Sequence, residues 1–275
     1  MFKGALSSIL AVAVSAIVLT LVPAVGLAQS GKGKASAAAG KGKASDGPGG
    51  VIAVNGVRDE NLPEPPAGPT PRAPNGKPDL SGVWLNGNYS FANMGGALPL
   101  QPWAQELEAK RRADLSKDDP EAKCLPTGVP RVTPYPMQII QSPTVIAMLF
   151  EGPLHTYRMF YLNRGHVTGD DFFPTWMGDS IARWEDDTLV VDTIGLNDQT
   201  WLNGRGTPHT DQLHVIERYT RPDLGHLDVE ITLEDPGAFT KPHTFKRQHV
   251  LSVTWEIHEF VCNEFNVDAD RLVGR

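Results

Sequence analysis

The second half of the chain is a succession of short β-type segments separated by turn residues, and this pattern limits the possible folds more than any other feature. Runs rich in β-branched and aromatic residues predict strands at 137–141, 144–151, 155–162, 180–184, 188–194, 213–221, 226–234, 243–251 and 254–262. Turn clusters such as Asn163-Arg164-Gly165 and Asp235-Pro236-Gly237 separate them. Because no long helical segment intervenes, we expect hairpin connections and a mainly antiparallel sheet.

One more strand and a single helix are predicted before this series. The strand is expected at 79–85, where apolar and polar residues alternate. The helix is expected to begin at Pro102, with Trp103 and Leu107 one turn apart, and to end before Lys117. About ten short strands in one domain predict an antiparallel β-barrel with one short helix. A β-sandwich is the alternative.

The N-terminal segment is typical of an export signal. A Lys near the start is followed by an apolar run at 5–22 and by small residues up to Ala28, which predicts a signal peptide at 1–28. An uncleaved membrane anchor is the alternative, since the run approaches the length of a bilayer span. Pro23 and Ala28 stand where an anchor would carry charges, so cleavage is favoured, with no stable membrane span afterwards.

Two segments of low complexity separate the signal from the folded domain. Residues 29–50 repeat Gly-Lys-Gly-Lys-Ala-Ser in a small-residue background, so we expect a flexible basic tether. Residues 51–78 contain seven prolines from Pro63 onward and are expected to form an extended strap. The β-barrel domain is therefore expected at 79–275.

Charge and cysteine content restrict the partners and the compartment. The formal net charge is −7 although the tether is basic, so the folded domain is acidic and nucleic acid is not an expected partner. Cys124 and Cys262 are the two cysteines of a chain that we expect to be secreted or periplasmic, where a disulfide forms readily. Two unrelated buried thiols are the alternative.

Several whole segments resemble a large, mostly uncharacterised family of exported bacterial proteins. The resemblance begins with Pro-Arg-Ala-Pro-Asn-Gly-Lys-Pro-Asp-Leu-Ser-Gly-Val-Trp at 71–84 and continues at 118–126, 174–193 and 213–218. In that family a His commonly follows Met-Gly where this chain has Asp179, so no role is carried over to this position. Gly82-Val83-Trp84 is also similar to the Gly-x-Trp element that starts the barrel of lipocalins and other calycins. These resemblances imply a barrel and no particular reaction.

Four residues are candidates for acid–base catalysis. They are His209, His214, Glu217 and Asp192. A carboxylate or imidazole enclosed by aromatic walls has its pKa moved toward neutrality, which suits proton transfer. On a regular strand His214 and Glu217 point to opposite faces, so only one of them can face the barrel interior. No His-x-His or His-Glu-x-x-His pattern is present, so neither a metal site nor another cofactor is predicted.

Each candidate also has a structural interpretation. Glu217 could pair with Arg158 or Arg183, Asp192 could hold a turn, and His155 could be a hydrogen-bonded core histidine.

Candidate substrate-binding residues surround the catalytic set. They are Trp176, Trp184, Trp201, His155, Tyr219 and Arg183. Trp201 lies in a polar loop with little reason to join a core, so we expect it at the rim of a pocket.

The sequence thus predicts an aromatic-lined pocket that acts on a small, largely apolar molecule by acid–base chemistry, as in a dehydratase, isomerase or hydrolase. The alternative is a non-catalytic small-molecule binding or carrier protein of the cell envelope. A third possibility is an envelope interaction module attached through the basic tether. The sequence does not predict an oligomeric state.

Overall fold

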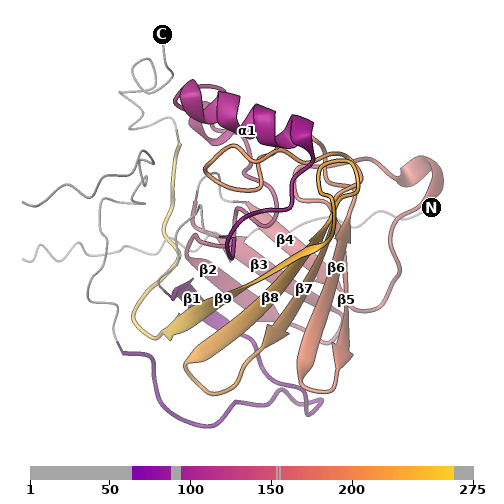
Figure 1. Cartoon of the computed structure of the whole chain (residues 1–275). Helices are drawn as coiled ribbons and strands as arrows, with labels where there is room; N and C mark the ends of the chain where they lie inside the picture. The colour runs from indigo at the N-terminus through magenta and orange to yellow at the C-terminus, as the bar shows by residue number, and fades with distance from the viewer. Residues whose placement is uncertain (1–63, 88–93, 153, 155, 263–275) are drawn as a thin grey trace, which may run out of the picture. The chain divides into compact units, whose positions relative to one another are not determined.

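The computed structural model of this chain describes residues 64–87, 94–152, 154 and 156–262. The expected signal peptide, the tether, the start of the strap and His155 lie outside these residues. The described part forms a closed β-barrel of nine strands with one α-helix (Figure 1). Closure of the sheet confirms the predicted barrel and excludes the β-sandwich. No helix of the described part is both long and apolar enough to cross a membrane.

The predicted strands agree closely with the observed elements. The strands are β1 (Gly82–Asn86), β2 (Met137–Gln141), β3 (Val145–Phe150), β4 (Tyr157–Tyr161), β5 (Asp179–Glu185), β6 (Thr188–Ile194), β7 (His214–Thr220), β8 (His226–Glu234) and β9 (His243–Ser252). The helix α1 spans Pro102–Ala113, with Pro102 at its first position, as the sequence predicts.

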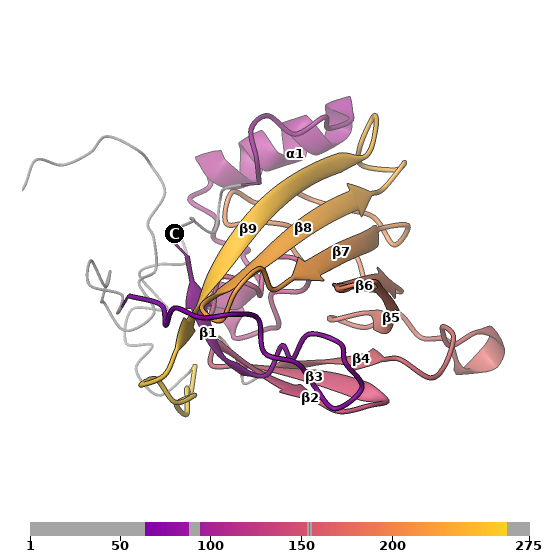
Figure 2. The ribbon, with the colours of Figure 1, turned by 90° about the horizontal axis from the view of Figure 1, so that it is seen from below.

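One pair of neighbouring strands differs from the expected hairpins. β4 and β5 are parallel, with only Phe160 opposite Ser180 and Tyr161 opposite Ile181, while every other pair in the barrel is antiparallel. The connection at 162–178 is therefore a crossover that carries the chain back along the barrel before β5 begins (Figure 2). The chain does bend after β4, as the turn cluster Asn163-Arg164-Gly165 predicts, but the expected hairpin connection is wrong for this pair.

The last predicted strand is also wrong. Residues 253–262 follow β9 without forming a strand among the described residues. β9 already pairs with β8 on one side and with β1 on the other, so the closed barrel has no free edge for a tenth strand.

The barrel interior is filled by the side chains that the strands direct inward. Alternate residues of each strand join one apolar core, which includes Trp84, Met137, Ile139, Met148, Phe150, Val191, Leu227 and Ile231. This alternation follows from the twofold side-chain period of a strand.

Trp84 and Arg221 close one end of this core. The Trp84 ring is fully buried, and its Nε1 donates to the Leu80 carbonyl at 3.0 Å. The Arg221 guanidinium lies 4.8 Å from the ring centre and donates to the carbonyls of Asp79 and Leu224. Gly82 lies beside them with a φ of 143°, a backbone conformation that residues with a side chain rarely adopt.

Helix α1 is fixed to the loops at the other end of β6, β7, β8 and β9. Trp103 Nε1 donates to the Gly237 carbonyl at 2.8 Å, and Arg111 Nη1 donates to the Gly206 carbonyl at 2.9 Å. The Thr207 hydroxyl donates to Glu108 at 2.6 Å. The helix therefore holds the loops at 195–213 and 235–242 in place (Figure 1).

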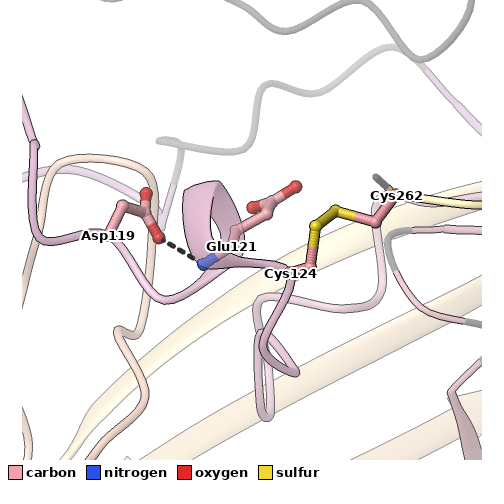
Figure 3. Close-up of a disulfide and its surroundings, with 4 residues drawn as sticks. All are labelled: Asp119, Glu121, Cys124 and Cys262. Carbon is pink, nitrogen blue, oxygen red and sulfur yellow. Dashed lines mark hydrogen bonds between the residues drawn. A yellow bond between two sulfur atoms is a disulfide. The ribbon is translucent and has the colours of Figure 1, made fainter. Parts of the chain in front are cut away.

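The two cysteines form a disulfide, as predicted. Cys124 and Cys262 are bonded with their Cα atoms 5.8 Å apart (Figure 3). Cys124 follows the short 3₁₀ helix η2 (Glu121–Lys123), whose first N–H is bound by the Asp119 carboxylate at 3.0 Å. The bond joins the segment after α1 to the extended tail rather than to a last strand, because that strand is absent.

Candidate functional site

The predicted site residues do not meet in one pocket. The structure separates the main candidates into the barrel interior, the loop at 195–213 and the outer face of the barrel. Each place has a different chemistry.

Glu217 points into the barrel and forms a buried ion pair. Its two carboxylate oxygens accept hydrogen bonds from Arg158 Nη1 at 3.0 Å and Nη2 at 2.5 Å, and both side chains are 0% exposed. Tyr219 donates to the same carboxylate at 3.0 Å, and Arg158 also donates to Thr193. Burial alone would lower the pKa of Arg158, but the charge of Glu217 raises it.

This ion pair with Arg158 is the structural role that the sequence analysis gave as the alternative to catalysis for Glu217. A carboxylate held by a bidentate guanidinium and a phenol, with no exposed surface, has no route to a substrate. Burial and the Glu217 charge raise the pKa of Tyr219 well above its usual value, so the phenol remains a fixed donor. The network joins β4, β6 and β7 across the interior.

His209 is buried in the loop at 195–213 with both ring nitrogens in contact. Nδ1 lies 2.8 Å from the Thr210 carbonyl, and Nε2 lies 2.7 Å from the Thr200 hydroxyl. The carbonyl only accepts, so Nδ1 carries the hydrogen and Nε2 accepts from Thr200. Burial lowers the pKa of His209, although the Thr210 contact opposes this, so the neutral ring is favoured. His209 therefore fixes the conformation of this loop through its two hydrogen bonds.

Trp201 is packed inside the same loop and does not line an open rim. It is 3% exposed, with the Arg111 guanidinium 4.7 Å and the Arg131 guanidinium 5.9 Å from its ring centre. Arg131 is itself held by Asp119 and Glu121. The expectation of a pocket rim is therefore wrong, because contacts of its ring with two guanidinium groups give this loop tryptophan a structural reason to be buried.

The other predicted binding residues are dispersed. Trp184 packs partly buried against the core, Tyr219 belongs to the interior network, and Arg183 is exposed and pairs with Glu185. Trp176 is half-buried in the crossover between β4 and β5, beside the bridge of Thr175 to Leu196.

Asp192 and His214 come together on the outer face of the barrel, in a chain of alternating carboxylates and imidazoles. We call this row of side chains the imidazole–carboxylate array. It comprises Asp179, His166, Asp192, His214 and Glu234. His166 Nε2 and His214 Nε2 both lie 2.9 Å from Asp192 Oδ1. The Nδ1 atoms lie 2.9 Å from Asp179 Oδ2 and 3.4 Å from Glu234 Oε2, respectively.

Strand register explains how these residues meet. Asp192 and Asp179 lie on neighbouring strands, with Ile181 directly opposite Asp192, and His214 lies directly opposite Glu234. These side chains point away from the core because they alternate with the inward residues of β5 to β8. His166 reaches them from the crossover between β4 and β5.

Both nitrogens of both imidazoles face carboxylate oxygens. Three of the four contacts are hydrogen bonds of 2.9 Å, and the fourth, from His214 Nδ1 to Glu234, is longer at 3.4 Å. The Arg164 guanidinium adds a cation to the array through its pair with Asp179. Burial disfavours the Asp179 carboxylate, but hydrogen bonds from Arg164, His166 and the Val167 N–H outweigh this and hold its pKa at about 2.

The array is accessible to solvent, unlike the interior network. The side chains of His166, Asp192 and His214 are 17%, 25% and 30% exposed. Ile181 and Ile216, the register partners of Asp192, lie on the same outer face and are partly exposed. A polar cluster that can exchange protons with water thus adjoins apolar surface.

The sequence prediction missed His166, Asp179 and Glu234. Glu234 could have been found, because it faces His214 if the two flanking strands form a hairpin. His166 could not, since its position depends on the parallel crossover.

Among the described residues, no group of three or more His, Cys, Asp or Glu side chains is arranged to hold a metal ion. The contacts of His166 with Asp179 and of both imidazoles with Asp192 are hydrogen bonds.

Comparison with known proteins finds no matching family model, no matching curated protein and no matching solved structure.

Proposed function

We propose that this chain is an exported β-barrel protein that performs acid–base chemistry on a small, largely apolar molecule at the imidazole–carboxylate array. The observation that carries the proposal is the convergence of two imidazole Nε2 atoms on one oxygen of Asp192, at 2.9 Å each, on a solvent-accessible face. Export is supported by the N-terminal segment and by the disulfide, which forms in oxidising compartments.

His214 is the proton carrier in this proposal. It is the more exposed of the two imidazoles, and its Nδ1 contact to Glu234 is the longest in the array, at 3.4 Å. A substrate hydroxyl or carbonyl that displaces Asp192 from Nε2 would meet a ring whose Nδ1 side remains next to Glu234. The Glu234 carboxylate orients the His214 ring and stabilises its charged form while the proton is transferred.

The remaining residues of the site hold Asp192 and bind the apolar part of the substrate. His166 is held on its other nitrogen by Asp179 and binds Asp192 Oδ1 from the side opposite His214's strand. Ile181 and Ile216 provide the apolar surface for the carbon skeleton. This arrangement suits dehydration, isomerisation or hydrolysis, which need one group to give a proton and another to take it.

The test compares turnover and binding on one panel of hydrophobic alcohols, enones and esters. We expect His214→Gln to lower kcat by about 10²-fold or more, because a positioned acid–base group contributes on this scale. Binding of the same compound, followed by thermal shift, should remain measurable. His226→Gln is the matched control, since His226 also contacts a carboxylate, Asp223, at 2.9 Å on the outer face.

Equal loss of turnover in the two variants would contradict the assignment of the array. A wild-type protein that binds panel members without turning any of them over would instead favour the carrier function.

A further inference from the structure

A cavity of about 280 Å³ lies beside α1, apart from the array and from the interior network. Its lining includes Met94, Leu98, Glu108, Arg112, Asn203 and Arg205. Met94 and Leu100 are buried, and Leu98 is partly buried, so part of the wall is apolar. Gly96, Ala97, Ala109, Arg112 and Arg205 are exposed, so the cavity is open to solvent.

Two lining arginines form no ion pair within the part of the chain that the structure describes. Neither Arg112 nor Arg205 forms an ion pair with a carboxylate of the described residues, although α1 places Glu108 one turn before Arg112, where such pairs often form. The Glu108 carboxylate instead accepts the Thr207 hydroxyl at 2.6 Å. The lining thus contains two guanidinium groups and one carboxylate that is already engaged, so it carries a net positive charge.

A buried amide donor in the same lining lacks a strong acceptor. Asn203 is 1% exposed, and its Nδ2 donates to the Met94 sulfur at 3.2 Å. A thioether is a weak acceptor. The amide oxygen is already satisfied by the backbone N–H groups of Arg205 at 2.8 Å and Thr207 at 3.4 Å. The amide hydrogens are therefore the part of Asn203 that a ligand acceptor would improve.

We propose that this cavity binds a small amphipathic carboxylate. Arg112 and Arg205 hold the carboxylate, since guanidinium groups match its planar pair of oxygens. The Asn203 amide donates to the ligand, and Met94 and Leu98 contact its apolar tail. At about 30 Å³ for each water-sized group, the cavity accommodates on the order of nine or ten non-hydrogen atoms.

The experiment compares octanoate, octanol and octylamine, which share a tail and differ in head group, by titration calorimetry with the full exported chain. We expect octanoate to bind at least 10-fold more tightly than the other two, and more weakly as salt is raised. The double variant Arg112→Gln/Arg205→Gln should lose at least 10-fold in octanoate affinity and leave octanol unchanged. Ala109→Phe should fill the cavity and weaken all binding.

Lys110→Gln is the matched control, because Lys110 lies next to Ala109 on α1 but does not line the cavity. Equal affinity for octanoate and octanol in the wild type would overturn the proposal without the need for any variant. Undiminished octanoate binding by Ala109→Phe would place the ligand elsewhere. Turnover on the substrate panel is not part of this readout, so either proposal can fail without the other.

Discussion

At the scale of single residues, the alternation of side chains along β7 decides which candidates can share a site. Glu217 shares a face of β7 with Val215 and Tyr219, so the sequence indicated an apolar environment for it, and His214 had to face the other way. The sequence could not show which of Arg158 and Arg183 would meet Glu217, because that depends on how far the barrel closes. The structure brings Arg158 from β4, 59 residues away.

We predict that Glu217→Gln destabilises the protein by about 3 to 5 kcal/mol, because it leaves the Arg158 charge buried without compensation. Urea unfolding, followed by far-UV circular dichroism, measures the change. The double variant Arg158→Met/Glu217→Leu should cost less than this single change, since no charge then remains inside.

Glu185→Gln is the control for this prediction. Glu185 also pairs with two arginines, Arg183 and Arg218, but on the exposed face of the barrel. Its replacement should leave the unfolding midpoint nearly unchanged. Equal effects of the two substitutions would mean that the interior pair contributes no more than a surface pair.

A second prediction at this scale concerns His249, which lies in the interior beside Arg247. Burial and the Arg247 charge lower the pKa of His249 from 6.5 to about 3, against the effect of a backbone hydrogen bond with Leu85. Between these two pH values the unfolded chain binds a proton that the folded chain does not. The free energy of unfolding should therefore fall as the pH is lowered from about 6.5 to about 3.

The measurement compares wild type with His249→Gln by urea unfolding across this range. The difference between the two proteins isolates His249, since the other titrating groups, including His209, are common to both. We expect the wild type to lose stability relative to the variant as the pH falls. A difference that stays constant from pH 7 to pH 3 would contradict the buried neutral state.

At the scale of elements, local pattern predicted what local forces determine. β2, β6 and β8 have the predicted bounds because Pro, Gly and Asp clusters end them and alternating side chains fill one face. The tail at 253–262 carries similar alternation in Trp255 and Ile257, yet it forms no strand because both sides of β9 are occupied. Whether a segment becomes a strand depends on a free partner edge, which composition does not encode.

The candidate site shows the same limit. Asp192 and His214 could be placed together from the consecutive strands β6 and β7. His166 could not, because it reaches them only through the parallel pairing of β4 with β5, where the sequence suggested a hairpin. The role of Trp201 was misjudged because the two arginines that enclose it come from α1 and from the segment before β2.

At the scale of the whole molecule, closure of the barrel leaves its two ends to be covered by segments outside the sheet. The strap at 64–78 contacts the turns at one end, where Arg72 pairs with Asp187 and Thr70 donates to the Arg221 carbonyl. Helix α1 covers loops at the other end. The disulfide is the covalent tie that joins the segment following α1 to the tail that leaves β9.

This tie should control global stability. Cys124 and Cys262 are 138 residues apart in sequence, so in the chain-entropy account their bond removes about 5 kcal/mol of unfolded-state entropy, and measured contributions are more often about 2 to 4 kcal/mol. We predict that Cys124→Ser/Cys262→Ser lowers the denaturation midpoint of the whole barrel, measured by urea unfolding with and without reductant. Reductant should lower the midpoint of the wild type and leave that of the variant unchanged. If only the tail were affected, the midpoint would stay constant while the chain around Trp255, whose Nε1 donates to Glu151 at 2.8 Å, became sensitive to protease. The disulfide would then stabilise the tail alone.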